Sequence, residues 1–479
     1  MHLHNLFNYN LALMIDSYKV SHWLQFPEGM ERSFYYVESR GGKYDETMMA
    51  GVAYLTKILE GGVTAQDIDY ANEFYKLHFG QDIFNYEGWM RIVNELGGKL
   101  PVRIRAVQEG QVIPVKNVLL TIENTVDGFG WLCGYLETFI LRAIWYPTTV
   151  ATISFRSKVV IAQALLDSSD LELSDYEAVL GFRLHDFGAR GVSSGESAAI
   201  GGLAHLYNFQ GSDTVESIEL GRNLFGCQMA GFSVPAREHS TTTCYLREGE
   251  YEAFMNSARE FGGGIFAVVI DSYSTKAALE WLTTNEEFIN IITEKGGQCV
   301  LRPDSGLPID MVRLCLDTVA KNVGYTTNTK GFKVLDSRFR VIQGDGVDGE
   351  AIERITTWVV YTLKYSQENF NYGMGGGLLQ HCDRDTQKFA MKCSAMKVSG
   401  AWRDVYKAPE TDPTKKSKAG RLDLTAIAGE YMTVLLQEEA ESHPHTIMDT
   451  VFEDGERYNV PTLEDIRSQA NFECTLLVN

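Results

Sequence analysis

The chain has 479 residues, of which 44% are hydrophobic and 11% aromatic, enough to bury a large core and to form two domains. Its formal net charge of -20 argues against nucleic acid or an anionic membrane as partner, because both favour clustered lysine and arginine. The start of the chain lacks a basic region before a short apolar run, and no later stretch approaches the roughly 20 apolar residues of a membrane span. We therefore expect a cytoplasmic protein.

The two ends of the chain share a mixed character. The first part combines helical patterns such as "YANEFYKLHF" with β-like runs such as "PVRIRAVQEGQVIPVKNVLLTIE", and the last part is rich in β-like runs and turns. We predict that residues 1–145 and 385–479 together form one discontinuous α+β domain.

A repeated pattern fills the middle of the chain. A short apolar run ends in a polar or glycine cluster, and a helical pattern follows, in steps of 25 to 41 residues. Steps of this size suit one strand, one helix and their loops, which gives successive βα units and a parallel sheet. The seven markers are Asp186, Asp213, Glu238, Asp271, Asp304, Asp345 and Gly373. The fold class predicted for residues 146–384 is an incomplete TIM-like α/β barrel, whose active site lies at the carboxyl ends of the strands.

One motif in the first unit is misleading. "RLHDFGARGVSS" contains Asp186-Phe187-Gly188, the tripeptide that holds magnesium in protein kinases. A kinase also needs a glycine-rich loop, a strand lysine and an His-Arg-Asp loop upstream, and the sequence has none of these. The tripeptide alone therefore does not indicate a kinase.

A second motif allows two interpretations. "GDGVDG", residues 344–349, matches G-x-G-x-x-G between a strand-like and a helical pattern, which is the context of a dinucleotide site in an oxidoreductase. However, Asp345 and Asp348 would place carboxylates beside the pyrophosphate. We favour a role in which Asp345 accepts hydrogen bonds from ribose hydroxyls while the glycines allow close approach of the backbone.

The third motif is "NYGMGGGLLQ", residues 371–380. Consecutive backbone N–H groups at the start of a helix bind anions, and barrels often place a phosphate after their last two strands. Gly375 and Gly376 are the candidate ligands. The alternative is a tight turn whose glycines serve only packing.

Charged residues follow the central strands. Asp271, Arg302 and Asp304, with Asp345, form an acidic set suited to Mg²⁺, which keeps several waters and binds jointly with phosphates. Each of them could instead make a structural ion pair. His239 could contact a phosphate or be a buried histidine with protein partners.

Several longer sequence motifs show a resemblance to a known family. The chain resembles the nicotinamide phosphoribosyltransferases, of the type II phosphoribosyltransferase family, in words spread in family order over nearly its whole length. The matching words are "DSYKVSH" (16–22), "LHDFGARGVSS" (184–194), "GSDTV" (211–215), "SVPAREHST" (233–241), "RPDSG" (302–306), "VIQGDGVD" (341–348), "GGGLLQ" (375–380), "RD" with "KCS" (384–394) and "DPTKKSKAGRL" (412–422).

The resemblance implies an activity. It is the transfer of the phosphoribosyl group from 5-phosphoribosyl 1-pyrophosphate to nicotinamide, which yields nicotinamide mononucleotide and pyrophosphate with Mg²⁺. It further implies a homodimer with shared active sites, and stimulation by ATP, which phosphorylates the histidine matching His239.

The resemblance also assigns roles to individual residues. Phe187 and the second protomer's Tyr18 would sandwich the nicotinamide ring, and Asp213 would accept from its carboxamide. Ribose and its 5′-phosphate would be held by Asp304, Gly344, Asp345, Gly375 and Gly376. Pyrophosphate would be surrounded by Arg190, His239 and Arg302, with Arg40, Arg384 and Lys392 from the second protomer. Asp271 and Asp304 would reach the metal through water.

Two alternatives and two departures remain. A nicotinate phosphoribosyltransferase has a related barrel, but the carboxylate of Asp213 would repel a carboxylate substrate. A non-catalytic mononucleotide-binding relative would keep the fold without turnover. Ala390 stands where the family has a serine near the phosphate, and Arg237 where it has a small residue.

Overall fold

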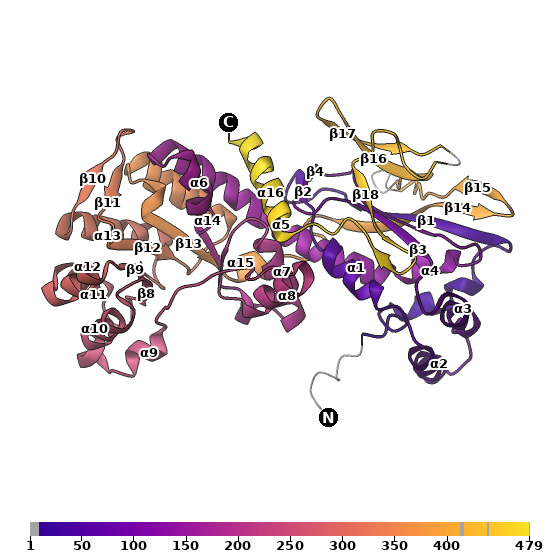
Figure 1. Cartoon of the computed structure of the whole chain (residues 1–479), viewed down its shortest axis with the longest axis horizontal. Helices are drawn as coiled ribbons and strands as arrows, with labels where there is room; N and C mark the ends of the chain where they lie inside the picture. The colour runs from indigo at the N-terminus through magenta and orange to yellow at the C-terminus, as the bar shows by residue number, and fades with distance from the viewer. Residues whose placement is uncertain (1–8, 412–415, 438–439, 479) are drawn as a thin grey trace. The chain divides into compact units, whose positions relative to one another are not determined.

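The computed structural model describes residues 9–411, 416–437 and 440–478 (Figure 1). Residues 412–415, the start of the "DPTKKSKAGRL" motif, lie outside this range. The chain divides into two compact units: unit 1 comprises Met1–Thr152 and Cys382–Ile466, and unit 2 comprises Ile153–His381 and Arg467–Asn479. This division differs by a few residues from the boundaries expected at 145 and 385. It also groups residues 467–479 with unit 2, whereas the sequence prediction placed them with the chain ends.

Unit 2 contains a six-stranded sheet in which every pairing is parallel. The strand order is β7-β6-β13-β12-β9-β8. Strands such as β8 have apolar residues on both faces, as expected for parallel strands covered by helices. The strands are β6 (Leu184–Asp186), β7 (Gly211–Ser212), β8 (Ile265–Val269), β9 (Gln298–Arg302), β12 (Phe339–Gln343) and β13 (Phe370–Met374).

The segment 232–236 connects the two edges of this sheet. It makes parallel bridges to β7 through Gly211 and Phe232, and to β8 through Ala236 and Ala267. The amide of Phe232 donates to the Gln210 carbonyl at 2.8 Å. Seven parallel segments therefore follow one another in a ring that is closed only by isolated bridges. The predicted incomplete α/β barrel is confirmed, and each predicted strand has a counterpart.

Helices or helical turns follow the strands, and several carry local start signals. The side chains of Ser194, Ser274 and Asp348 cap α7, α11 and α14, and Pro308 opens α13. The helical elements are α6 (Leu173–Leu180), η3 (Ala189–Gly191), α7 (Gly195–His205), α8 (Val215–Phe225), α9 (His239–Thr243), η4 (Arg247–Gly249), α10 (Glu250–Phe261), α11 (Thr275–Thr284), α12 (Glu286–Lys295), α13 (Pro308–Asn322), α14 (Gly349–Thr356), η5 (Thr357–Thr362), η6 (Gln367–Asn369) and α15 (Gly376–Leu379). A short hairpin, β10 (Tyr325–Thr327) with β11 (Lys333–Leu335), completes the unit's strands.

Unit 1 is built around a seven-stranded sheet of order β15-β14-β1-β5-β3-β18-β19. Its three central strands, β1, β5 and β3, come from the start of the chain and are flanked on each side by two strands from its end. β1 pairs antiparallel with both β14 and β5. This confirms an α+β region assembled from both chain ends. Its strands are β1 (Met30–Ser39), β2 (Glu46–Met48), β3 (Val102–Val107), β4 (Val112–Pro114), β5 (Val118–Asn124), β14 (Phe389–Val398), β15 (Ala401–Asp404), β16 (Leu422–Ile427), β17 (Glu430–Leu435), β18 (Met448–Glu453) and β19 (Glu456–Arg457).

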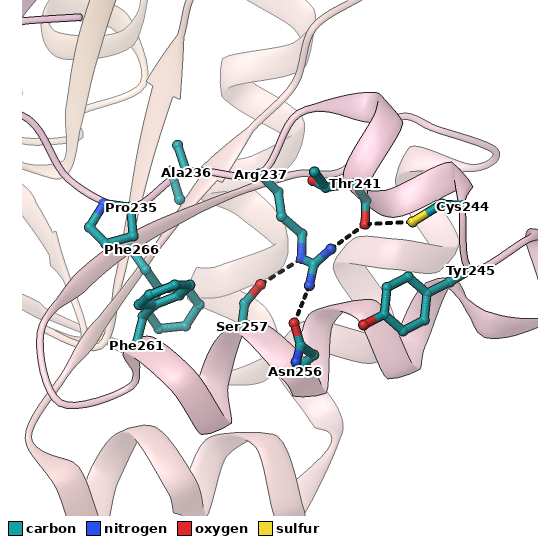
Figure 2. Close-up of a pocket in the computed structure, with 11 residues that line it drawn as sticks. Pro235, Ala236, Arg237, Thr241, Cys244, Tyr245, Asn256, Ser257, Phe261 and Phe266 are labelled. Carbon is teal, nitrogen blue, oxygen red and sulfur yellow. Dashed lines mark hydrogen bonds between the residues drawn. The ribbon is translucent and has the colours of Figure 1, made fainter.

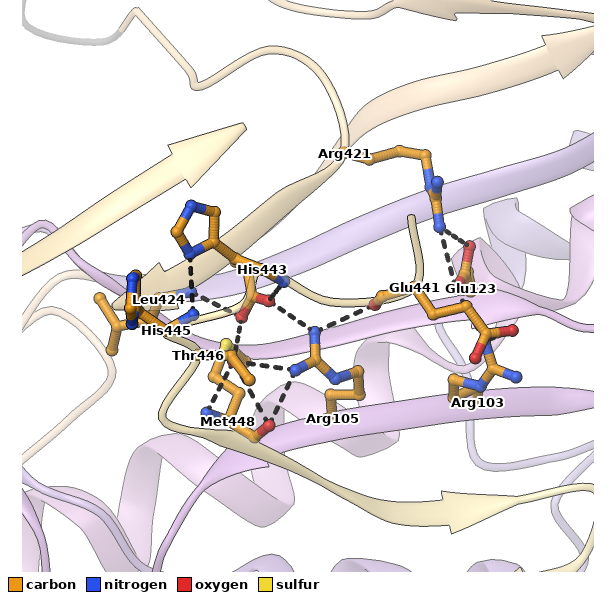
Figure 3. A network of polar contacts seen from close by, with 11 residues as sticks. Arg103, Arg105, Glu123, Arg421, Leu424, Glu441, His443, His445, Thr446 and Met448 are labelled. Atoms are coloured by element: carbon orange, nitrogen blue, oxygen red, sulfur yellow. Dashed lines mark hydrogen bonds and ion pairs between the residues drawn. The ribbon is translucent and has the colours of Figure 1, made fainter. Parts of the chain in front are cut away.

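A buried polar network fastens the late segments of unit 1 onto β3 (Figure 3). The guanidinium of Arg105 donates to Asp423 at 2.9 Å, to the Thr446 hydroxyl at 2.9 Å and to the Met448 carbonyl at 2.8 Å. Asp423 also accepts from the His443 amide at 2.8 Å. The Arg105 and Asp423 side chains are only 7% and 0% exposed, so the partners of this charge pair are all protein groups.

Among the residues that the structure describes, one helix meets the length and composition of a membrane span, contrary to the expectation from sequence. It is α5 (Glu137–Ser168), and 72% of its most apolar window is buried inside the structure. Burial to this extent is typical of a core helix. The remaining helical elements are η2 (Ser17–Leu24), α1 (Val52–Glu60), α2 (Ala65–Phe79), α3 (Tyr86–Leu96), α4 (Gly130–Tyr135) and α16 (Leu463–Leu477).

Candidate functional site

The loops after the barrel strands carry most of the predicted site residues. Phe187 follows β6 directly, and its amide donates to the Met374 carbonyl of β13 at 2.9 Å. Its ring packs against a buried cluster of Ala267, Val300 and Ile342 inside the barrel. The ring therefore has a fixed place at the carboxyl ends of the strands.

Two glycines make room for this ring. A Cβ atom on Gly373 would lie 2.0 Å from Cε2 of Phe187, and one on Gly344 would lie 3.0 Å from the same atom. Real side chains do not approach as closely as the first distance, so residue 373 must be glycine for the ring to lie here. Gly344 thus has a packing role in addition to the ribose role predicted for it.

A cavity of about 790 Å³ opens beside Phe187 and runs along the inside of the barrel. Asp213 lines it, and its Oδ1 accepts a short hydrogen bond from the Ser233 hydroxyl. The cavity walls are largely apolar, with a few polar groups, as in ligand pockets generally. Its polar and charged lining residues include Asp213, Ser233 and Arg302 near the strand ends and Arg183, Gln298, Arg340, Glu368 and Asn371 further along.

Sequence reasoning missed the charged end of this cavity. Arg183 donates to Asn371 Oδ1 at 2.7 Å and to the Glu368 carbonyl at 3.0 Å, and burial lowers the pKa of its guanidinium to about 10. Arg340 donates to the Asp336 carbonyl at 3.0 Å. These arginines precede or begin the strands, so a search restricted to strand carboxyl ends does not find them.

His239 lies between two carboxylates. Its Nε2 is 3.0 Å from Oδ1 of Asp271, and its Nδ1 is 3.7 Å from Oδ2 of Asp304. The His239 side chain is 43% exposed and that of Asp304 34%, so an incoming ligand can reach both. The alternative of a buried histidine does not hold for His239, and one oxygen of Asp271 has His239 as its protein partner.

The second oxygen of Asp271 is also engaged. Its Oδ2 accepts from the Ser305 hydroxyl at 2.5 Å. Among the residues that the structure describes, no three His, Cys, Asp or Glu side chains converge on a possible metal position. A cation here would therefore have to be held through water and through a bound ligand, which is how Mg²⁺ is commonly held.

Arg302 ends β9 and lines the same cavity. Its Nη2 donates to the Arg237 carbonyl at 3.1 Å, which directs the guanidinium towards the loop that carries His239. In the sequence, Arg237 stands out only as a departure from the family pattern, and no local pattern predicts this contact.

The "GDGVDG" motif forms a turn followed by a capped helix. Gln343 Nε2 donates to the Asp345 carbonyl at 2.8 Å, while the Asp345 side chain is exposed. Asp348 accepts from the Ala351 amide at 2.8 Å and so caps α14 with its own carboxylate. A carboxylate already occupies the position where a dinucleotide fold would receive pyrophosphate, which argues against the oxidoreductase interpretation.

The glycine loop after β13 forms a single helical turn. The amides of Leu378 and Leu379 both donate to the Gly375 carbonyl, so the amides of Gly375 and Gly376 lie at the open start of that turn. The η3 turn carrying Arg190 lies nearby, because a Cβ on Gly191 would be 3.8 Å from the Gly376 Cα. Arg190 itself is exposed. The structure thus brings together the arginine and the glycines that the sequence assigned to phosphates.

Asp186 has a structural environment. It is fully buried, its Oδ1 accepts from the Gly188 amide at 2.7 Å, and its Oδ2 lies 3.4 Å from the Ser212 hydroxyl. Burial raises the pKa of its carboxyl to about 6. This carboxylate shapes the turn that presents Phe187 and does not face the cavity loops as a ligand.

Four predicted site residues belong to unit 1. Tyr18 in η2 is 61% exposed. On the main sheet, Arg40 Nε donates to Glu38 at 2.9 Å, and Lys418 also pairs with Glu38. Lys392 on β14 pairs with Tyr36 of β1, and burial together with nearby cations, Arg40 among them, lowers its pKa. The fourth residue, Arg384, is exposed and pairs with Asp385.

The departure at residue 390 is explained in part. Ala390 lies on β14 opposite Glu38 and is 7% exposed. It therefore lies beside the Glu38 and Arg40 pair but offers no hydroxyl group to a ligand.

The fold and these loops together define an α/β-barrel enzyme whose strand ends present a ring platform, carboxylates and glycine loops of the kind that bind phosphorylated ligands. Residues 182–456 match the nicotinate phosphoribosyltransferase (NAPRTase) family, and residues 10–104 match the nicotinamide phosphoribosyltransferase N-terminal domain. The chain belongs to the nicotinate phosphoribosyltransferase family and is thus a pentosyl-transferring enzyme.

Relatives cover the chain almost completely. A nicotinamide phosphoribosyltransferase of Xanthomonas campestris is 48% identical over 96% of this chain and 98% of its own. One from Acinetobacter baylyi is 28% identical over 97% of each chain. Among solved structures, a Pyrococcus furiosus nicotinate-nucleotide pyrophosphorylase has a TM-score of 0.65 at 15% identity and covers 100% of this chain and 99% of its own. Human nicotinic acid phosphoribosyltransferase has a TM-score of 0.55 at 16% identity, with coverage of 97% and 94%. These two support the fold.

Proposed function

We propose that the enzyme transfers the phosphoribosyl group of 5-phosphoribosyl 1-pyrophosphate to nicotinamide, which gives nicotinamide mononucleotide and pyrophosphate for NAD salvage. The observation that carries this proposal is the aromatic platform of Phe187 beside Asp213 at one end of a large cavity. The names of the curated relatives support the same substrate.

Asp213 supplies the selectivity in this proposal. Ser233 holds one carboxylate oxygen, which leaves the other to accept from the amide N–H of nicotinamide. Nicotinate would bring a second carboxylate to the same place, and two like charges repel strongly in a partly dry pocket. The alternative, a nicotinate phosphoribosyltransferase, therefore requires a different role for Asp213.

The mechanism proposed needs no protein nucleophile. The pyridine nitrogen attacks C1 of the ribose as the C–O bond to pyrophosphate breaks, through a transition state with positive charge on the ribosyl group. Asp304 and Asp345 stabilise that charge, and Arg190 and Arg302 take the charge of the leaving pyrophosphate. Stacking on Phe187 orients the ring nitrogen, which supplies much of the remaining rate enhancement.

Magnesium is proposed as the metal of the reaction. It would neutralise part of the charge on the bound pyrophosphate. Because both oxygens of Asp271 already have protein partners, we propose that Asp271 and Asp304 reach the ion through its waters.

ATP is proposed to phosphorylate His239. An imidazole nitrogen attacks the γ-phosphorus, the N–P bond forms, and ADP leaves with the bond electrons. The exposure of His239 and its hydrogen bond to Asp271, which fixes the ring, support this role.

We also propose that the protein is cytoplasmic and forms a homodimer, in which each protomer contributes residues to the other's active site. Tyr18 of one protomer would cover the nicotinamide ring on the Phe187 of the other, and Arg40, Arg384 and Lys392 would contact its pyrophosphate. Mixing Phe187→Ala with a variant in which Arg40, Arg384 and Lys392 are all replaced by methionine, each inactive alone, tests this directly. Shared sites predict recovery of up to about a quarter of the wild-type sites after subunit exchange, whereas sites within one protomer predict none.

The activity itself is tested by following nicotinamide mononucleotide formation with Mg²⁺, nicotinamide and 5-phosphoribosyl 1-pyrophosphate, with and without ATP. We expect product in wild type and a higher product yield with ATP, and loss of the ATP effect in His239→Ala. No mononucleotide under any condition would favour the non-catalytic binding relative. An equal ATP effect in both proteins would refute the phosphohistidine hypothesis without contradicting the transferase activity.

A further inference from the structure

Arg237 lies where the barrel ring closes, two residues before His239. Its amide donates to the Ala267 carbonyl of β8 at 2.9 Å, and its carbonyl accepts from Arg302 of β9 at 3.1 Å. The backbone of residue 237 is therefore held by two neighbouring strands. Its side chain runs away from these strands towards α10 (Figure 2).

The side chain binds three separate groups on two helices. Nε donates to the Ser257 hydroxyl at 2.6 Å and Nη2 to Asn256 Oδ1 at 2.6 Å, both on α10. Nη1 makes a short hydrogen bond to the Thr241 carbonyl on α9. The guanidinium carbon lies 5.5 Å from the centre of the Tyr245 ring, which follows α9.

A pocket of about 350 Å³ surrounds these groups, lined by Arg237, Tyr245 and Phe261 among others (Figure 2). A ligand-binding arginine would direct its donors into such a pocket. All three nitrogens of Arg237 instead donate to protein acceptors, so its chemistry is that of an anchor.

Arg237 anchors α9, the short helix that carries His239. His239 begins α9, a helix of only five residues, which has too few backbone hydrogen bonds to be rigid alone. Through Thr241 and Tyr245, Arg237 fastens both the middle and the end of this short segment to α10. At its other side, the imidazole makes one contact of 3.0 Å to Asp271 and a longer approach of 3.7 Å to Asp304.

We propose that Arg237 is a positioning residue for His239: it clamps α9 to α10 and so holds the imidazole between Asp271 and Asp304 in the orientation that accepts the phosphoryl group of ATP. This inference rests on the proposed phosphohistidine. A small residue at position 237, as in the family pattern, could not join α9 to α10. The clamp is therefore a feature of this chain and not of the family pattern. Phosphoryl transfer depends on in-line geometry, and a displacement near 1 Å can cost about 100-fold in rate.

The test compares Arg237→Ala and Arg237→Lys with Arg338→Ala. Arg338 is a matched control, because its guanidinium also bonds several acceptors in unit 2, at Asp336 and Thr293, without contacting the site. The measurements are the rate of ³²P transfer from ATP to the protein, the KM for ATP, and the melting temperature.

We expect Arg237→Ala to lower the maximal phosphorylation rate about 100-fold. Lysine can replace one of the three donors, so Arg237→Lys should be intermediate, with a loss of about tenfold. The KM for ATP should stay within about twofold, because an interaction that only orients the acceptor does not bind ATP. Arg338→Ala should accept ³²P from ATP at the wild-type rate at any temperature where the variant is folded.

Other results would overturn the inference. A wild-type phosphorylation rate in folded Arg237→Lys and Arg237→Ala would show that α9 needs no clamp. A KM for ATP raised tenfold with an unchanged maximal rate would make Arg237 a ligand of ATP. Absence of ³²P transfer in wild type, or equal transfer in His239→Ala, would instead refute the phosphohistidine on which the inference rests. Failure of the inference and failure of the proposed function are thereby distinguished.

Discussion

Two polar networks of the molecule contain similar groups but have opposite accessibility. In unit 1, the Arg105 and Asp423 side chains are almost completely buried and have protein partners on all sides. In unit 2, His239 and Asp304 are about two-fifths and one-third exposed, and one approach between them is 3.7 Å long. The closed network stabilises the fold, whereas the open one leaves bonding capacity for a ligand. The comparison shows that exposure and incomplete pairing, more than charge itself, separate a functional cluster from a structural one.

Breaking the closed network should give the largest effect, and only on stability. Arg105→Met leaves Asp423 charged and buried, which costs about 3–5 kcal/mol of unfolding free energy. Arg32→Met is the control, because the side chains of its pair with Asp127 are 33% and 53% exposed and the pair should contribute about 1 kcal/mol or less. Denaturant unfolding gives the free energies. Activity per folded molecule should be unchanged in both, and a loss of activity in folded Arg105→Met would contradict a purely structural role.

A buried carboxylate beside the open site should behave as a structural group. The pKa of Asp186 rises from 3.8 to about 6 on folding. Its contribution to stability is therefore fully present below pH 3.8 and is lost as the pH rises through 6, by roughly 3 kcal/mol in total. Asp186→Asn keeps the acceptor for the Gly188 amide but does not titrate. The difference in unfolding free energy between variant and wild type should grow from pH 4 to pH 7 in favour of the variant, and a pH-independent difference would refute the raised pKa.

The open site should instead respond in activity to a small change in shape. Gly373→Ala forces the Phe187 ring away from its place, and we expect kcat/KM for nicotinamide to fall about 100-fold. Gly349→Ala is the control, because a Cβ there meets nothing within 4 Å. Similar kinetics for both variants would show that the ring position is unimportant.

The smallest of these effects is expected at Lys392 of unit 1. Lys392→Met should raise the KM for 5-phosphoribosyl 1-pyrophosphate about tenfold through the loss of one charge-assisted contact. Lys397→Met, on the same strand but paired with Glu31, should leave it unchanged. An unchanged KM in Lys392→Met would show that this lysine does not contact the pyrophosphate.

Much of the barrel could be predicted because each βα unit leaves a local signal. Apolar runs ending at Asp186, Asp271, Arg302 and Asp345 marked strand ends, and even the irregular segment 232–236 had its counterpart in the predicted series. The contacts that define the site are not local. The bond from Ser233 to Asp213, the Arg183 end of the cavity and the clamp of Arg237 join residues whose proximity depends on closure of the ring. No pattern in a single sequence indicates such pairings.

The most direct test of the account is the rate of mononucleotide formation from nicotinamide and from nicotinate, measured in wild type and in Asp213→Asn. The account predicts a strong preference of wild type for nicotinamide. It also predicts that Asp213→Asn reduces this preference, because the amide side chain no longer repels a carboxylate and can donate to it. If wild type used both substrates equally and Asp213→Asn changed neither rate, the proposed recognition of the carboxamide by Asp213 would be contradicted.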